Sequence, residues 1–296
     1  MKYFSLLMLS LMAFAACQTS KTTETAETQE AVPVTLTLKW ETDTILTTCE
    51  SVIYDKDNDV LYVSNIEGSA SEKDGEGSIS KLGLDGNIVD PQWISGLNAP
   101  KGLGIAKGKL YAADIDVIVE IDIASGQVTN KYPVEGAKFL NDVTTDAEGR
   151  VFVSDSQAGN VVLLENGKVT KWLEGVAGPN GLLSEADQML IALWDVKTLS
   201  VIDLETKAIT SKTDNLENPD GIEPIGDGGY LVSSWNGLVH YVSPAWEKTL
   251  ILDTRADSIS AADIEYIQDK NLLLVPTFYK NKVMAYELTT GAADVQ

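Results

Sequence analysis

The sequence predicts an all-β protein, a six-bladed β-propeller whose last blade is closed by an N-terminal strand. Two observations support this fold class: one phrase recurs six times along the chain, and each copy continues into short alternating strands separated by turn residues. Successive copies start 51, 40, 39, 40 and 42 positions apart, and they begin at Glu50, Lys101, Asn141, Asn180, Asp220 and Ala262. A period near forty residues with four strands per unit is typical of propeller blades.

The expected strands follow in order from residue 34. Residues 34–41, "VTLTLKWE", alternate in polarity and precede the first copy, so we expect a spare strand there. Five copies then contain four strands each, whereas the sixth ends near Leu288 after three. Pairing of strand 34–41 with this last blade would supply the missing edge and close the ring. No long helix is expected.

The first repeat is longer than the others because of the segment 65–78, "NIEGSASEKDGEGS". It is rich in glycine and charge, and it lies between the second and third strands of the first blade. Two interpretations are open: a plain surface insertion, or a loop that covers one end of the ring.

The residues before the expected fold form two segments. Residues 1–16 combine a positive start at Lys2 with a short apolar run and small residues, a pattern typical of a signal peptide. The residues "FAAC" are similar to a bacterial lipobox, which implies that Cys17 is lipidated; ordinary secretion is the alternative. Residues 17–33 are expected to be a disordered tether, and residues 34–296 the propeller. The chain is therefore predicted to be a bacterial cell-envelope protein that meets the membrane only through its lipid anchor.

Composition excludes one class of partner. The formal net charge is −22, from 44 acidic and 22 basic residues. Nucleic-acid backbones require a positive protein surface, so nucleic acid is excluded. With Cys17 lipidated, Cys49 is the single remaining thiol, and we expect it to be buried without a disulfide. We expect a monomer.

Oxygen-bearing side chains recur at the residue that begins each copy. In a propeller the first strand of every blade lines the central channel, so these residues should surround one channel mouth. Glu50, Asn141, Asn180 and Asp220 supply carboxylate and amide oxygens, which hard cations such as Ca²⁺ prefer. The only histidine, His240, lies in a third strand, so neither a zinc site nor a Ser-His-Asp triad is supported. The pattern predicts a divalent-cation site, with Ca²⁺ as the expected ion.

The segments "GPNGLL" at 178–183 and "NPDGIE" at 218–223 also allow a simpler interpretation. Asn and Asp before Gly are common in turns that lead into strands. The two segments are either a repeated turn or a shared frame that directs Asn180 and Asp220 at one point. Their register with Glu50 and Asn141 favours the second interpretation.

Four stretches resemble the regucalcin/gluconolactonase family: "CES" at 49–51, "FLNDVTTDAEGRVFVSD" at 139–155, "GPNGLLSEAD" at 178–187 and "NPDGIEPIGDGG" at 218–229. The resemblance spans residues 44–288. It implies a six-bladed propeller that holds a divalent metal at the channel mouth and hydrolyses lactones or esters. It also implies that Glu50, Asn180 and Asp220 are metal ligands, that Asn141 lies near metal and substrate, and that Asp220 is the general base. Metal-assisted hydrolysis needs no histidine.

Three positions depart from that family, among them Val143, which ends "NDV" at 141–143 where the family has NDG. Its sugar-lactone members carry an arginine two residues before the Asn141 position, where this chain has Phe139; a more apolar lactone or ester is therefore expected. Lys101 also lies in the ring, where it either neutralises Glu50 or Asp220 and replaces the cation, or stabilises a developing oxyanion. The sequence thus predicts a metal-dependent lactone or ester hydrolase in which Lys101 and Phe139 bind substrate. The alternative is a non-catalytic propeller that binds a small ligand or a protein partner.

Overall fold

The computed structural model describes Met1 and residues 34–291. The predicted signal peptide, the lipidation site Cys17 and the tether fall on residues 2–33 and lie outside the described residues, apart from Met1. Across the described part of the chain, no helix has the length and apolar character needed to cross a membrane.

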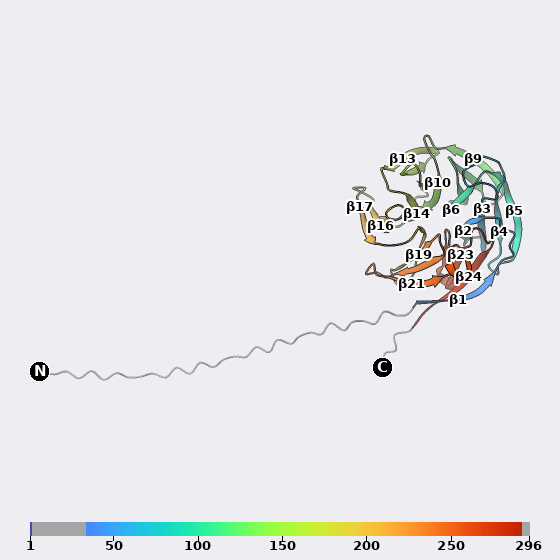
Figure 1. Cartoon of the computed structure of the whole chain (residues 1–296). Coiled ribbons are helices and arrows are strands. Elements are labelled where there is room, and N and C mark those ends of the chain that lie inside the picture. The colour runs from blue at the N-terminus through green and yellow to red at the C-terminus, as the bar shows by residue number, and fades with distance from the viewer. Residues whose placement is uncertain (2–33, 292–296) are drawn as a thin grey trace.

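Six antiparallel four-stranded sheets follow one another round a ring, as predicted (Figure 1). The first three blades are β2 (Cys49–Asp55), β3 (Val60–Asn65), β4 (Gly77–Leu82) and β5 (Ile88–Leu97); β6 (Pro100–Ala106), β7 (Lys109–Asp114), β8 (Val117–Asp122) and β9 (Gln127–Pro133); and β10 (Leu140–Thr145), β11 (Val151–Asp155), β12 (Asn160–Glu165) and β13 (Lys168–Glu174). The next two are β14 (Pro179–Ser184), β15 (Gln188–Leu193), β16 (Thr198–Asp203) and β17 (Ile209–Thr213); and β18 (Pro219–Pro224), β19 (Tyr230–Ser234), β20 (Leu238–Val242) and β21 (Lys248–Asp253). In Figure 1 the inner strands β2, β6, β10 and β14 lie toward the middle of the ring, and β5, β9, β13, β17 and β21 lie at its rim.

The sixth blade closes the ring in the predicted way. Its strands are β22 (Glu265–Ile267), β23 (Leu272–Pro276), β24 (Val283–Thr290) and β1 (Val34–Glu41). β1 pairs antiparallel with β24, so the N-terminal strand supplies the outer edge. The inner strand β22 is only three residues long, and Ala262 lies before it, outside any strand. Within the described range the only helices are two single-turn 3₁₀ segments, Arg255–Asp257 and Gln268–Lys270.

The apolar core is divided among the six interfaces between neighbouring blades, each with its own cluster of buried side chains. Strand alternation produces this division, because successive side chains point to opposite faces of a sheet. On β3, for example, Leu61 and Val63 pack against the sixth blade, whereas Tyr62 packs against the second. Because both faces of each blade are used in this way, the apolar core lies between the blades.

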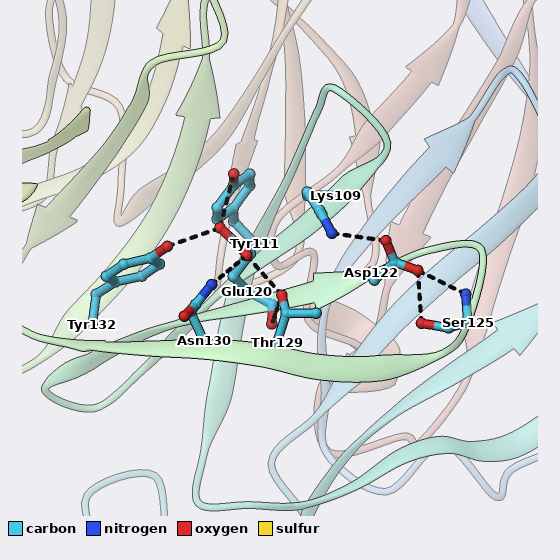
Figure 2. A network of polar contacts seen from close by, with 8 residues as sticks. All are labelled: Lys109, Tyr111, Glu120, Asp122, Ser125, Thr129, Asn130 and Tyr132. Atoms are coloured by element: carbon cyan, nitrogen blue, oxygen red, sulfur yellow. Dashed lines mark hydrogen bonds and ion pairs between the residues drawn. The ribbon is translucent and has the colours of Figure 1, made fainter. Parts of the chain in front are cut away.

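Outside the channel, a polar network joins β7, β8 and β9 in the second blade (Figure 2). The Glu120 carboxylate accepts hydrogen bonds from Thr129 Oγ1 (2.7 Å), Asn130 Nδ2 (2.8 Å) and Tyr132 Oη (3.0 Å). Partial burial raises the pKa of Glu120, but these hydrogen bonds outweigh it, so that the pKa lies below its ordinary value. The network links the two outer strands of this blade by side-chain contacts.

Close approach of neighbouring inner strands explains the glycines in the repeated segments. A Cβ atom at position 181 would lie 1.8 Å from the backbone oxygen of Asp220, and one at position 221 would lie 2.6 Å from the backbone nitrogen of Ile264. The turn expected in these segments lies earlier, since Gly178 and Asn218 have φ of 59° and 47°. Each inner strand of the first five blades also has an irregular register at its start. Such bulges redirect side chains, here at the residues that begin the copies.

Candidate functional site

One mouth of the channel opens into a cavity of about 390 Å³, hereafter the mouth cavity. The structure brings together here all the predicted site residues within its described range: Glu50, Lys101, Phe139, Asn141, Asn180 and Asp220. Five of them come from the first five blades at the equivalent start position, and Phe139 lies two residues before Asn141. The convergence follows from the repeat, because equivalent positions of a ring face the same axis.

A row of amide hydrogen bonds joins three of the ring positions. Asn141 Nδ2 donates to Asn180 Oδ1, and Asn180 Nδ2 donates to Asp220 Oδ1 (3.0 Å). Asn141 Nδ2 also donates to Ser156 Oγ (3.1 Å), whose hydroxyl donates to the Pro179 carbonyl (2.7 Å). The row fixes the two amides and one oxygen of Asp220 across three adjacent blades.

Glu50 and Asp220 are buried carboxyl groups, and their hydrogen bonds and neighbouring positive charge do not offset the effect of burial on their pKa values. Burial, and then the charge of Asp220, raise the pKa of Glu50 well above its ordinary value, although the Lys101 charge opposes the shift. Burial, and then the charge of Asp142, raise the pKa of Asp220 to about 8, against the hydrogen bond from Asn180. Glu50 Oε2 is buried and has no hydrogen-bond partner. A buried polar atom without a partner is costly, so this oxygen is a candidate contact for a ligand in the cavity.

Lys101 is fully enclosed, with 2% of its surface exposed. Its ammonium donates to the carbonyls of Ala70 (3.1 Å) and Ala99 (3.0 Å) and lies 4.3 Å from the centre of the Phe139 ring. Burial lowers the pKa of Lys101 to about 8, although Glu50 and Asp114 raise it. Among residues 34–291, no carboxylate oxygen lies within 4.0 Å of this nitrogen. Lys101 is therefore held beside the carboxylates and not in contact with them.

The cavity residues fit a hard cation in number and kind of donor. Glu50 and Asp220 supply two carboxylates, and the side chains of Asn141 and Asn180 carry amide oxygens, the donor types that Ca²⁺ takes together with water. No cluster of three His, Cys, Asp or Glu side chains suited to a metal occurs in the described residues, so the amides are needed to complete the set. In the structure Asn180 turns its nitrogen toward Asp220, so its oxygen would reach a cation only after the amide rotates.

Aromatic side chains form one wall of the mouth cavity. Trp194, Trp235 and Phe278 each follow the second strand of a blade, in the fourth, fifth and sixth blades respectively, and Tyr279 comes next to Phe278. None of these four aromatic residues was singled out from the sequence as a member of the site. Their position after the second strand of a blade was the signal that could have identified them. The insertion also contributes, because Ile66 and Ala70 line the same cavity.

A second cavity of about 400 Å³ opens at the other end of the inner strands. Its acidic groups include Asp142, Glu223, Asp263 and Glu265. Asp142 accepts hydrogen bonds from the backbone amides of Val143 (2.6 Å) and Leu182 (2.5 Å), so that it braces the third blade against the fourth. Asp263 accepts a hydrogen bond from Ser51 Oγ (2.5 Å), which braces the sixth blade against the first. Carboxyl groups thus line both ends of the channel.

Because burial raises the pKa of carboxyl groups in this second cavity, we expect the free energy of unfolding to decrease as the pH rises. Burial raises the pKa of Glu265 to about 7, against the hydrogen bond from the Tyr54 amide. A raised folded-state pKa gives stability that is complete below the unfolded value near 4.3 and is lost as pH rises through about 7. In EDTA, we expect the unfolding free energy of the wild type to fall by about 2–3 kcal/mol between pH 5 and pH 8 from this group.

Thermal unfolding of the wild type and Glu265→Gln at both pH values checks this prediction. The variant keeps an oxygen for the Tyr54 amide but cannot ionise. The Tm of the variant should exceed that of the wild type by about 5–10 °C more at pH 8 than at pH 5. An equal difference at the two pH values would contradict the prediction.

The fold and the mouth cavity define a six-bladed β-propeller with a polar, partly aromatic channel mouth. No protein-family model matches the chain, and no curated protein matches it either. The regucalcin/gluconolactonase resemblance is thus not shown by these comparisons.

Solved structures with the same fold include streptogramin B lyases. A catalytically inactive histidine variant of virginiamycin B lyase from Staphylococcus aureus, solved with quinupristin, matches with a TM-score of 0.62 and 14% identity over 87% of this chain and all of that one. A streptogramin B lyase structure matches with a TM-score of 0.59 and 12% identity over 87% of this chain and 98% of that one. At these identities the similarity shows the propeller fold alone.

Proposed function

We propose that the protein is a hydrolase that opens a lactone or an ester in the mouth cavity with the help of a divalent cation, Ca²⁺ being the expected one. The observation that carries this proposal is Glu50 Oε2, a buried oxygen without a partner in a ring that also holds Asp220. Two enclosed carboxyl groups with raised pKa values are a costly arrangement that a cation would relieve.

In this proposal Glu50, Asn141, Asn180 and Asp220 hold the cation. The bound ion would polarise the carbonyl of the substrate and favour attack by water. Asp220 accepts the proton of the attacking water through the carboxylate oxygen that does not hold the cation. The hydrogen bond from Asn141 to Ser156 keeps that amide in place, whereas the hydrogen bond from Asn180 to Asp220 opens as the Asn180 amide rotates toward the cation.

Lys101 and Phe139 act on the substrate side of the cavity. The Lys101 ammonium has two of its three protons bonded to carbonyls and faces the Phe139 ring. A positive charge fixed in an enclosed site stabilises an oxyanion as it forms. Phe139 places an aromatic face where a polar substrate would need hydrogen bonds, which supports an apolar lactone or ester.

Chemistry that depends on histidine does not suit this cavity. His240 is the only histidine of the chain, and it lies in β20, away from the residues that line the mouth cavity. The propeller lyase solved with quinupristin is described as inactive after substitution of a histidine. This difference supports a mechanism for this chain that uses carboxylates and a cation.

The direct test is hydrolysis of a panel of apolar lactones and aryl or alkyl esters by the purified protein, with Ca²⁺ and with EDTA. Turnover in Ca²⁺ that disappears in EDTA and returns on addition of the ion supports the proposal. Binding of panel compounds without turnover under Ca²⁺, Mg²⁺, Mn²⁺ or Zn²⁺ would favour the alternative, a propeller that binds a ligand without catalysis. The lipid anchor at Cys17 and the envelope location are part of the same proposal, and mass determination of the mature N-terminus tests them.

Lys101→Met distinguishes two roles of the lysine. If the lysine lies beside an authentic cation site, its removal takes away a like charge, and we expect Ca²⁺ affinity to rise about 3- to 10-fold with turnover reduced. Calorimetric titration of Ca²⁺ into both proteins measures the change. Binding by the variant together with none by the wild type would show instead that the lysine replaces the cation.

A further inference from the structure

Three aromatic rings that line the mouth cavity meet one another in a corner. Phe278 and Tyr279 meet edge to face, with ring centres 4.7 Å apart and planes at 89°. Trp235 meets both in the same way, 5.3 Å from Phe278 and 6.0 Å from Tyr279. All three line the cavity, yet Tyr279 is 68% exposed. A large aromatic ring left open beside two others is the kind of surface that a ligand covers.

The corner is held rigidly. Phe278 has a φ of 51°, a left-handed conformation that is unusual for a bulky residue, and its amide donates to the carbonyl of Cys49 in the first blade (3.2 Å). Asn281, at the end of the same turn, accepts a hydrogen bond from the Thr48 amide on its Oδ1 (2.8 Å). Backbone strain of this kind persists only where the surroundings impose it, and it is concentrated at functional sites.

The missing side chain at the sixth ring position creates the space for the corner. Ala262 stands where the other blades carry Glu, Lys, Asn or Asp. It belongs with Phe278 to one buried cluster, and Trp235 packs against that cluster. The polar ring is therefore interrupted on one side by aromatic surface. In a six-membered ring the fifth blade, with Trp235, lies across the axis from the second blade, with Lys101.

We propose that the corner formed by Trp235, Phe278 and Tyr279 is a subsite for an aryl group, so that the substrate is a lactone or ester with an aromatic substituent. The inference rests on the proposed function only for the lactone or ester part. The aryl ring packs against the exposed face of Tyr279 beside Trp235, and the carbonyl then lies toward Glu50, Asp220 and Lys101. Tyr279 is the specificity-determining residue because its exposed face is the one that the ligand covers.

Binding of matched probes tests the subsite without relying on turnover. In EDTA, calorimetry compares γ-phenyl-γ-butyrolactone with γ-cyclohexyl-γ-butyrolactone, which has nearly the same size and no aromatic ring. We expect the phenyl compound to bind the wild type at least about 5-fold more tightly, since edge-to-face contacts require an aromatic ring. Tyr279→Leu should weaken phenyl binding about 5- to 10-fold and remove the preference, whereas Tyr279→Phe should retain it.

Controls separate this proposal from the function on which it rests. Val196→Ala removes another exposed apolar side chain, one that does not line the mouth cavity, and should change nothing. Equal affinity for the two probes, no binding of either, or a phenyl preference that survives Tyr279→Leu would overturn the aryl subsite. A preference that depends on Tyr279 without hydrolysis under any cation would leave the subsite standing and remove the hydrolase. Hydrolysis of lactones with no aryl preference would support the hydrolase and remove the aryl subsite.

Discussion

Asp220→Asn should abolish turnover while leaving the protein at least as stable as the wild type. The amide has the shape of the carboxylate but cannot accept the proton of water, and loss of a positioned general base reduces the rate about 10²- to 10⁴-fold. Loss of a cation ligand from the same residue adds to this reduction. The free energy of unfolding should rise in the variant, because Asp220 is 3% exposed and burial raises its pKa to about 8. A neutral isostere removes the cost of burying that charge.

The measurements are the hydrolysis rate in Ca²⁺ and the melting temperature in EDTA at pH 8. Glu148→Gln, a change at an exposed carboxylate on the opposite side of the third blade, is the matched control and should alter neither. If Asp220→Asn lowered the melting temperature and kept the activity, Asp220 would be a structural residue and the proposed mechanism would be wrong.

Gly181→Ala should be the most destabilising small substitution in the ring. The added methyl carbon would lie 1.8 Å from the backbone oxygen of Asp220, and the obstacle is backbone that cannot rotate away. Overpacking that requires backbone movement costs about 3 kcal/mol or more, which corresponds to a fall of about 6–12 °C in Tm. Because the displaced backbone is that of Asp220, Ca²⁺ binding should weaken as well.

Thermal unfolding and Ca²⁺ titration of the variant check this prediction. Gly136→Asn is a suitable control, since Gly136 has a φ of 78°, which asparagine tolerates, and has open space around its Cβ position. We expect that control to unfold within about 2 °C of the wild type. A Gly181→Ala protein with unchanged Tm would mean that the fourth and fifth blades are not held as closely as the structure shows.

The sequence predicted the ring of six blades and its closure, because both depend on repeated local patterns. Each copy has the same alternation and turns, and one spare strand at 34–41 matches one missing edge at the end. The shared register also brought Glu50, Asn141, Asn180 and Asp220 to one place. The ring therefore needed no knowledge of long-range contacts.

The remainder of the site depends on contacts that no local pattern encodes. The direction of Lys101 is set by Ala70, a residue of the insertion that the repeat does not contain. Asp142 follows Asn141 in the same strand, but it lines the opposite cavity, where it accepts hydrogen bonds from the Val143 and Leu182 amides. The open aromatic corner follows from the short inner strand of the sixth blade, where Ala262 leaves room for Phe278.

The measurement that tests the central claim most directly is calorimetric titration of Ca²⁺ into the wild type and into Glu50→Gln. Glu50 is the residue whose buried Oε2 has no hydrogen-bond partner, so Glu50→Gln removes the charge without breaking a hydrogen bond at that atom. We predict one site per chain with a Kd of about 10–1000 μM in the wild type, and binding at least about 10-fold weaker in the variant. Absence of binding by the wild type, or equal binding by the two proteins, would contradict a cation site at the channel mouth.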